Sequence, residues 1–229
     1  MKNFIQIALM AFIILMPLKN FAQSDCNPYY LLEEGRKWTT ANYNAKDKYQ
    51  GKQHYEVLEV SEESGKLVAK MMLTSYDKKD EIVLEEEVEF VCKDGVLQMD
   101  MTKYMPQETM ESFKEMDVEM EFDAVTIPEE LEVGQYLEDG GINMKVNGPI
   151  PIKMSVKIQD RKVMAKENIE VPAGSYEAFK INSIVKFEAM MTRETKTVDW
   201  VAEKVGVVRS EQYDKKGKLS GYTVLTEIE

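Results

Sequence analysis

The sequence predicts an all-β protein built as a single strongly curved antiparallel sheet, a half-open barrel, with one short helix near residues 107–116. Two observations carry this prediction. Apolar and polar residues alternate along many short segments, as they do on a strand with one buried face. Turn sequences that contain glycine separate those segments at short intervals. A continuous polar face favours one large sheet with solvent on one side.

Alternation and turn chemistry together define the expected strands in chain order. The expected hairpins are 55–60 with 67–73, 83–92 with 96–101, and 205–213 with 219–228, with turns at Ser64-Gly65, Asp94-Gly95 and Lys216-Gly217. Further strands are expected at 118–124, 152–158 and 179–189. Further turns are expected at Asp139-Gly140-Gly141, Asn147-Gly148-Pro149 and Pro172-Ala173-Gly174.

One segment follows a helical period instead. Met110, Phe113 and Met116 are three residues apart, and Pro106 suits the start of a helix. We expect this helix to cover part of the apolar face of the sheet.

The first 22 residues have the layout of a secretory signal peptide. Lys2 precedes an apolar run over 4–18, and the small residue Ala22 follows. The run is shorter than the roughly 20 residues that a membrane-spanning helix needs. A retained N-terminal anchor is the alternative. Residues 23–229 are then expected to form a single β-rich domain without a transmembrane segment.

The net charge limits the classes of partner. The whole chain carries −12, and residues 1–22 hold Lys2 and Lys19 and no acid, so the remainder carries −14. A chain this acidic repels nucleic acids and anionic membrane surfaces, so neither is an expected partner. A charged partner would be cationic, and the acidic residues otherwise form a solvated surface.

Both cysteines follow the signal-like segment. An even count in an exported chain predicts a disulfide between Cys26 and Cys92, which would close a loop of 66 residues. Acylation of Cys26, as in bacterial lipoproteins, is the alternative, although Gln23, Ser24 and Asp25 do not suit it. Two cysteines and one histidine make a poor zinc site, which needs four N or S ligands.

The sequence contains no constellation typical of an enzyme. His54, the only histidine, lies in a strand-like segment and is interpreted as a surface residue. Phosphate-loop, dinucleotide and calcium-loop motifs are missing. Carboxylate pairs that would suit a glycosidase are expected by chance in a chain so rich in Glu. We therefore expect no catalytic residue, no metal and no cofactor.

Methionine is the one enriched residue type, with 13 after position 22. Gap-filling in an ordinary core is one interpretation, and a cavity that adapts to varied apolar ligands is a second. A copper site at Met99 and Met101 is a third. If a cavity exists, the residues expected to line it are large apolar ones on alternating strands: Met120, Phe122, Met154, Phe187 and Trp200.

Four sequence segments together resemble a known family. The first begins with Cys26-Asn27-Pro28-Tyr29-Tyr30, and the second begins with Val171-Pro172-Ala173-Gly174. The third runs from Trp200 and includes Gly206-Val207-Val208, and the fourth begins with Tyr213-Asp214-Lys215-Lys216-Gly217. Their order resembles the TapB-like branch of the domain of unknown function 3108, from exported proteins of Bacteroidetes-type bacteria. The resemblance implies a half-barrel-like sheet in the periplasm or at the surface of a Gram-negative cell, and it lends no catalytic residues.

Two functional hypotheses remain ahead of an undetected hydrolase. The first is a non-enzymatic envelope protein that holds an apolar ligand, such as an acyl chain or lipid, in the concave face of the sheet. The second is a structural or protein-interaction module with a solid core.

Gly206, within an apolar run, predicts a bulge or bend where the sheet tightens.

Overall fold

The computed structural model describes residues 27–99, 117–147, 152–189 and 191–229. These residues form twelve strands of one antiparallel sheet, and the described part contains no helix. The strands are β1 (Lys37–Asn44), β2 (Tyr49–Glu63), β3 (Lys66–Asp77), β4 (Ile82–Lys93), β5 (Val96–Met99), β6 (Asp117–Asp123), β7 (Gly140–Asn147), β8 (Ile152–Val171), β9 (Gly174–Glu188), β10 (Thr192–Ala202), β11 (Gly206–Tyr213) and β12 (Leu219–Ile228).

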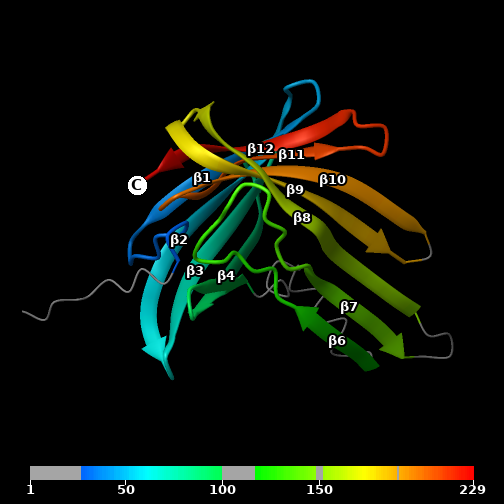
Figure 1. The fold of residues 1–229 in the computed structure, drawn as a ribbon, viewed down its shortest axis with the longest axis horizontal. Helices are drawn as coiled ribbons and strands as arrows, with labels where there is room; N and C mark the ends of the chain where they lie inside the picture. The colour runs from blue at the N-terminus through cyan, green and yellow to red at the C-terminus, as the bar shows by residue number, and fades with distance from the viewer. Residues whose placement is uncertain (1–26, 100–116, 148–151, 190) are drawn as a thin grey trace, which may run out of the picture.

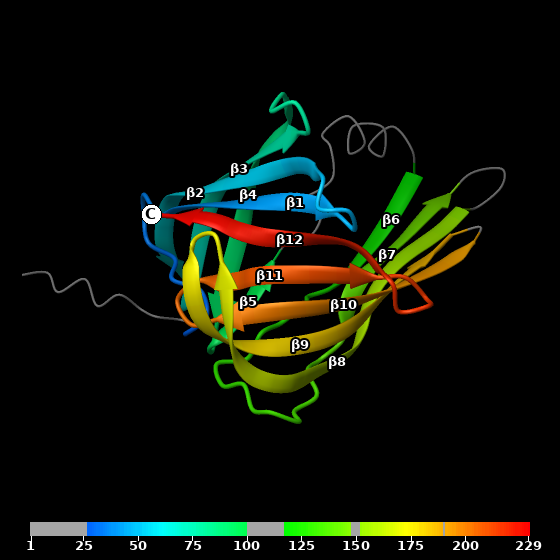
Figure 2. The same ribbon diagram turned by 90° about the horizontal axis from the view of Figure 1, so that it is seen from above.

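The strand order is β5-β4-β3-β2-β1-β12-β11-β10-β9-β8-β7-β6. The first and last strands therefore pair at the middle of the sheet, and two meanders extend from that pair in opposite directions. Figure 1 shows the result as an arch, with β2–β4 descending on one side and β6–β9 on the other. The two edge strands, β5 and β6, do not pair, so the sheet is not closed into a barrel (Figure 2).

These findings confirm the predicted fold class, and they correct some of its details. The predicted helix at 107–116 lies outside the described residues. Gly140 and Gly141, expected in a turn, begin β7. A Cβ on Gly141 would collide with the carbonyl of Val156, so glycine permits close pairing of β7 with β8.

The tight turns follow the sequence closely. Ser64-Gly65 and Asp94-Gly95 each supply two consecutive residues with positive φ, as a two-residue hairpin turn of type I′ requires. Strand β8 extends further than alternation predicted, because register shifts at 159–162 and 163–165 interrupt the pattern without ending the strand.

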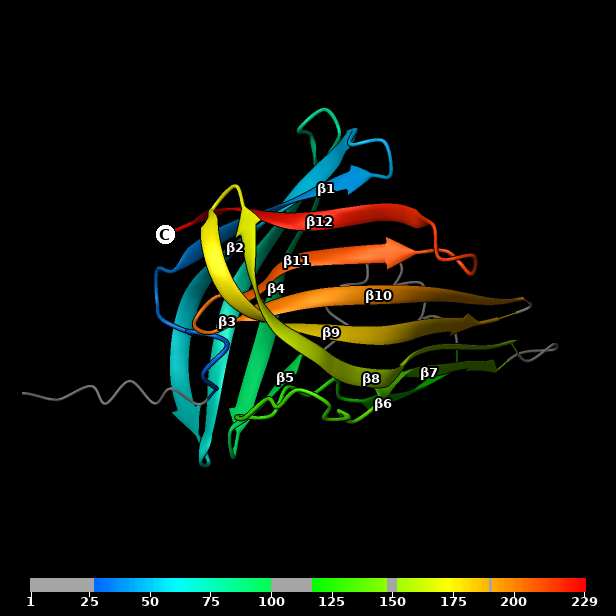
Figure 3. The same ribbon diagram turned by 45° about the horizontal axis from the view of Figure 1, so that its top comes forward.

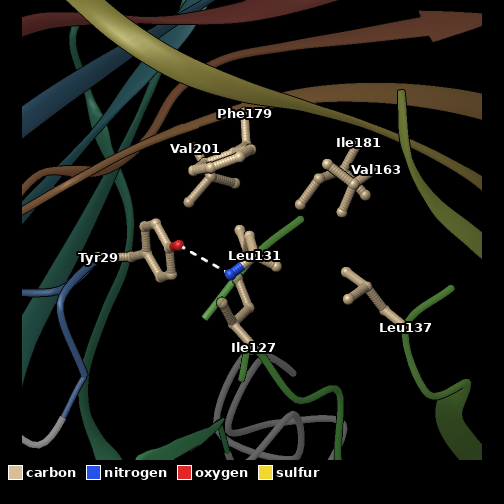
Figure 4. Close-up of a cluster of buried hydrophobic side chains, with 8 residues drawn as sticks. All are labelled: Tyr29, Ile127, Leu131, Leu137, Val163, Phe179, Ile181 and Val201. Atoms are coloured by element: carbon tan, nitrogen blue, oxygen red, sulfur yellow. Dashed lines mark hydrogen bonds between the residues drawn. The ribbon is translucent and has the colours of Figure 1, made fainter. Parts of the chain in front are cut away.

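The concave face of the arch carries two apolar clusters. One, on β2–β5, contains Val57, Met71, Leu73, Val88 and Phe90. The other is drawn in Figure 4 and joins Tyr29, β8–β10 and the β6–β7 connection: Tyr29, Ile127, Leu131, Leu137, Val163, Phe179, Ile181 and Val201. In it the Tyr29 hydroxyl accepts a hydrogen bond from the backbone N–H of Leu131, at 3.1 Å.

The convex face is not uniformly polar, in contrast to the expected wet face. A third cluster there includes Val198, Trp200, Val208 and Val224. The tip of the β8–β9 hairpin folds back toward β12, where the Ala173 N–H donates to the carbonyl oxygen of Leu225 at 3.4 Å (Figure 3). The predicted turn at Pro172-Ala173-Gly174 thus forms this tip, and it lies over the outer side of the sheet.

Candidate functional site

A hollow of about 310 Å³ opens on the concave face between β8–β11 and the β6–β7 connection. Its walls are mostly apolar, and five polar side chains also line it: Arg161, Ser183, Thr197, Asp199 and Ser210. The volume lies at the lower end of the range of about 300–1,000 Å³ that is common for small-molecule sites. Arg161 and Asp199 are the charged residues among the described ones that line it.

Arg161 enters the hollow because β8 bulges at that point. The register between β8 and β9 shifts between Gln159 and Lys162, and Asp160 adopts a positive φ of 54°. Such a bulge redirects side chains that regular alternation would place elsewhere. Arg161 is 4% exposed, and its Nη1 donates to the carbonyl oxygens of Thr126 at 2.9 Å and Glu138 at 2.6 Å.

These two hydrogen bonds fasten both ends of the β6–β7 connection to β8. Backbone hydrogen bonds from Gly134 to Val163 and from Leu137 to Arg161 continue the attachment. The connection also bridges to β5 through Leu97 and Ile127, so it spans the opening between the edge of β5 and the bulge of β8. Burial lowers the pKa of Arg161, while Asp199 acts in the opposite direction by stabilising the charged form.

Asp199 lies on β10, opposite Ser210 of β11, and faces the same hollow. Burial raises the pKa of its carboxyl group, and the hydroxyl of Ser210 and the charge of Arg161 offset part of this rise. Asp199 and Arg161 do not belong to the close ion pairs formed among the described residues. Two opposite charges therefore face one hollow without direct contact.

Tyr30 divides the concave face into two compartments. It lines the hollow described above and also a second one of about 200 Å³ toward Trp38 and Tyr55. The Tyr30 ring can lie here because residue 206, at the start of β11, is a glycine. A Cβ at that residue would collide with the ring. The φ of +85° at Gly206 also suits glycine. Gly206 was predicted at a bulge or bend within an apolar run, and it lies at the first position of β11, directly after the turn from β10.

An apolar strip leads from the hollow along the arm formed by β6–β9. Ile158 and Val185, which line the hollow, pair across β8 and β9, and the next inward pair along the arm is Val156 with Phe187. Met154 follows two residues further along β8 and pairs with Met144. The strip is half-buried, and Phe187 is exposed.

The predicted lining residues divide between this strip and the opposite face. Met120, Met154 and Phe187 belong to the strip through their register pairs, and Phe122 pairs with Ile142 in the same part of the sheet. Trp200 lies on the convex face, where its Nε1 donates to Glu167 at 2.8 Å and Lys180 lies over its ring. Trp200 therefore does not line the concavity.

Sequence analysis missed Arg161 and Asp199, and it named Tyr30 only as part of a segment that resembles the family. The available signal was Asp160-Arg161, a charged pair that interrupts the apolar set between Ile158 and Val163. The bulge in β8 directs this arginine into the hollow. Cys92 faces the β2–β5 cluster and is 1% exposed. Cys26 lies outside the described residues, so its pairing with Cys92 stays a prediction.

A larger hollow, of about 440 Å³, lies at the outer end of the arm. It is lined largely by charged residues, including Lys145 and Glu119, which pair with each other at 3.1 Å. Mutually paired, solvent-exposed charges offer a ligand little that water does not. The concave hollow, with apolar walls and buried polar groups, is the better candidate site.

The described residues offer little for catalysis. No group of three or more His, Cys, Asp or Glu side chains in them is arranged to hold a metal ion. His54 lies on β2, where its Nδ1 is 3.1 Å from the hydroxyl of Thr39, and it does not line the hollow. Within the described part of the chain, no helix combines the length and apolar character that crossing a membrane requires.

Two solved structures share this fold, both with a TM-score of 0.70. One, from Bacteroides fragilis NCTC 9343, is named as an exported protein with a YmcC-like fold; it is 23% identical, and the match covers 89% of this chain and all of that one. The other, from Parabacteroides distasonis ATCC 8503, is named as a lipoprotein; it is 24% identical, with 90% and 100% covered. No curated protein matches the chain. A sequence model of the DUF3108-like family matches residues 33–225, and the chain belongs to that family.

Proposed function

We propose that this protein is an exported, non-enzymatic envelope protein that binds an apolar molecule in the concave hollow. The observation that carries the proposal is the hollow itself, which retains about 310 Å³ between mostly apolar walls. Burial of apolar ligand surface there contributes roughly 25 cal/mol per Å². No chemical step is needed.

The apolar strip of the arm extends the proposed site. Its register pairs bring Met120, Met154 and Phe187 into line with Ile158 and Val185 at the hollow. A chain longer than the hollow would continue along this strip. Methionine suits such a surface because its flexible, polarizable side chain adapts to ligands of different shape.

Export is supported by two observations. Residues 1–22 have the layout of a signal peptide, and both structural neighbours carry names that place them outside the cytoplasm. We also propose the Cys26–Cys92 disulfide. Asn27, next to Cys26, donates to the carbonyl oxygens of Gly95 and Ile127, both at 2.9 Å, which holds the N-terminal arm near the β4–β5 turn. Cys92 precedes that turn by two residues.

A matched pair of variants tests the binding proposal. Thr197 lines the hollow, whereas Lys196, its neighbour on β10, points to the opposite face and is exposed. Thr197→Phe should fill part of the hollow and weaken binding of the neutral apolar dye N-phenylnaphthylamine about tenfold or more, a difference of about 1.4 kcal/mol. Lys196→Phe should leave the affinity unchanged. Affinity is read from dye fluorescence, and circular dichroism confirms that both variants fold.

Failure of the wild-type protein to bind the dye, with no apolar molecule released by solvent extraction, would overturn the proposal. Equal dye binding by the wild type and Thr197→Phe would also contradict it. Those results would favour the second hypothesis, a structural or protein-interaction module.

A further inference from the structure

The charged side chains that line the hollow, Arg161 and Asp199, limit which head group a ligand can have. Arg161 uses Nη1 for the carbonyl oxygens of Thr126 and Glu138, and its Nη2 and Nε make no hydrogen bond within the described part of the chain. These donors remain available beside the hollow. Asp199 supplies carboxylate oxygens, one of which interacts with Ser210. The site thus presents both donors and acceptors.

The two side chains also balance each other in charge. One positive and one negative group line the hollow, and other charged side chains are missing from its lining as far as the structure describes it. A ligand with a charged head would upset this balance: an anion meets Asp199, and a cation meets Arg161. An unbalanced charge in a buried site is costly because the site has lost most of the solvation that water gives.

We propose that the ligand is a neutral long-chain amphiphile whose head group both donates and accepts hydrogen bonds, such as a primary amide or a hydroxyl, held between Arg161 and Asp199. The head accepts from the guanidinium and donates to the carboxylate. The tail lies against Ile158 and Val185 and continues along the arm. This inference rests on the proposed function, because it assumes that the concave hollow is the binding site.

Matched twelve-carbon ligands test the head group. Dodecanamide, dodecanoic acid and dodecylamine share one tail length and differ in charge, so competition with N-phenylnaphthylamine compares their heads directly. Dodecanamide should bind the wild type about tenfold or more tighter than either charged ligand, because its neutral head can pair with both Arg161 and Asp199 without adding an unbalanced charge to the site. This ranking needs no variant, so it does not depend on a substituted protein folding.

Asp199→Asn then tests the charge balance. With the carboxylate removed, Arg161 is unopposed, and dodecanoic acid should gain about tenfold in affinity relative to dodecanamide. Glu227→Gln makes the same change of charge at an exposed position of β12 and should leave the ranking unchanged. Thermal unfolding monitored by circular dichroism checks that both variants are folded.

The outcomes separate the two proposals. If the wild type does not bind the dye, the proposed function fails. If the dye binds but dodecanamide has no advantage over the acid and the amine, or if Asp199→Asn leaves the ranking unchanged, the head-group proposal is overturned and the binding function stands.

Discussion

The two halves of the concave face are built from the same sheet with the same alternation, yet their interiors differ. On β2–β5, Met71 and Leu73 are fully buried within one apolar cluster. On β8–β11, Arg161 and Asp199 face a hollow. Close packing contributes stability, whereas a hollow lined with buried polar groups reduces it. On the proposed function, β2–β5 is the supporting half and β8–β11, which lines the hollow, is the functional half.

The largest expected effect concerns the link between the N-terminal arm and the supporting half. If Cys26 and Cys92 are joined, reduction should lower the free energy of unfolding by about 4 kcal/mol on the chain-entropy model for a loop of 66 residues. Urea unfolding with and without reductant measures this, and Cys92→Ser serves as the control that reductant should not affect. Detection of two free thiols in the native, unreduced protein would contradict the prediction.

Packing of the supporting half is tested next. Leu73→Ala should cost about 2–5 kcal/mol in the free energy of unfolding, because Leu73 is fully buried among the side chains of β2–β4. Leu58→Ala, at a position on β2 that is 43% exposed, is the matched control and should cost much less. Similar losses for the two variants in chemical denaturation would show that β2–β5 is not the closely packed half.

The boundary between the halves depends on Gly206 and Tyr30. Gly206→Ala should cost about 1–3 kcal/mol more than Gly217→Ala. Both glycines have positive φ, so backbone strain is common to the two variants, but a Cβ at Gly217 meets no atom within 4 Å, while one at Gly206 collides with Tyr30. Thermal or urea unfolding gives the comparison. Equal costs would mean that Tyr30 is free to move away.

The smallest effect is a pH dependence in the functional half. Burial raises the pKa of Asp199 above its ordinary value of 3.8, so the folded protein holds this proton more tightly than the unfolded chain does. The contribution of Asp199 to stability therefore falls as the pH rises from 3.8 through the raised pKa. Across that window, the free energy of unfolding of Asp199→Asn should rise relative to that of the wild type by at most about 1.4 kcal/mol per pH unit. Urea titrations at several pH values measure the difference, and a difference that does not vary with pH would contradict the assignment.

Sequence patterns predicted the supporting half better than the functional half. Alternation and the paired turn residues Ser64-Gly65 and Asp94-Gly95 lead directly to the hairpins of β2–β5, because hairpin register is local. The inward position of Arg161 depends on a bulge in β8. Asp199 becomes part of a site only through its neighbours on β8 and β11. Such non-local juxtapositions leave no periodic signal.

Trp200 illustrates the same limit. Size and apolar character predicted that it would line the concavity, but its position on β10 has the opposite parity from Asp199 and Val201, so its side chain packs on the convex face with Ala178 and Val224. The strand was read from apolar content without its register against β9. Met120, Met154 and Phe187 were placed together because simple alternation holds throughout the arm.

The contrast between the two halves is tested most directly by nuclear magnetic resonance of the complex with dodecanamide, in protein with labelled methyl groups. We predict intermolecular nuclear Overhauser effects from the ligand chain to the methyl groups of Ile181 and Val185, which line the hollow, and none to those of Leu73 and Val88. Contacts to the β2–β5 methyl groups, or a bound ligand that contacts neither half of the concave face, would contradict the account.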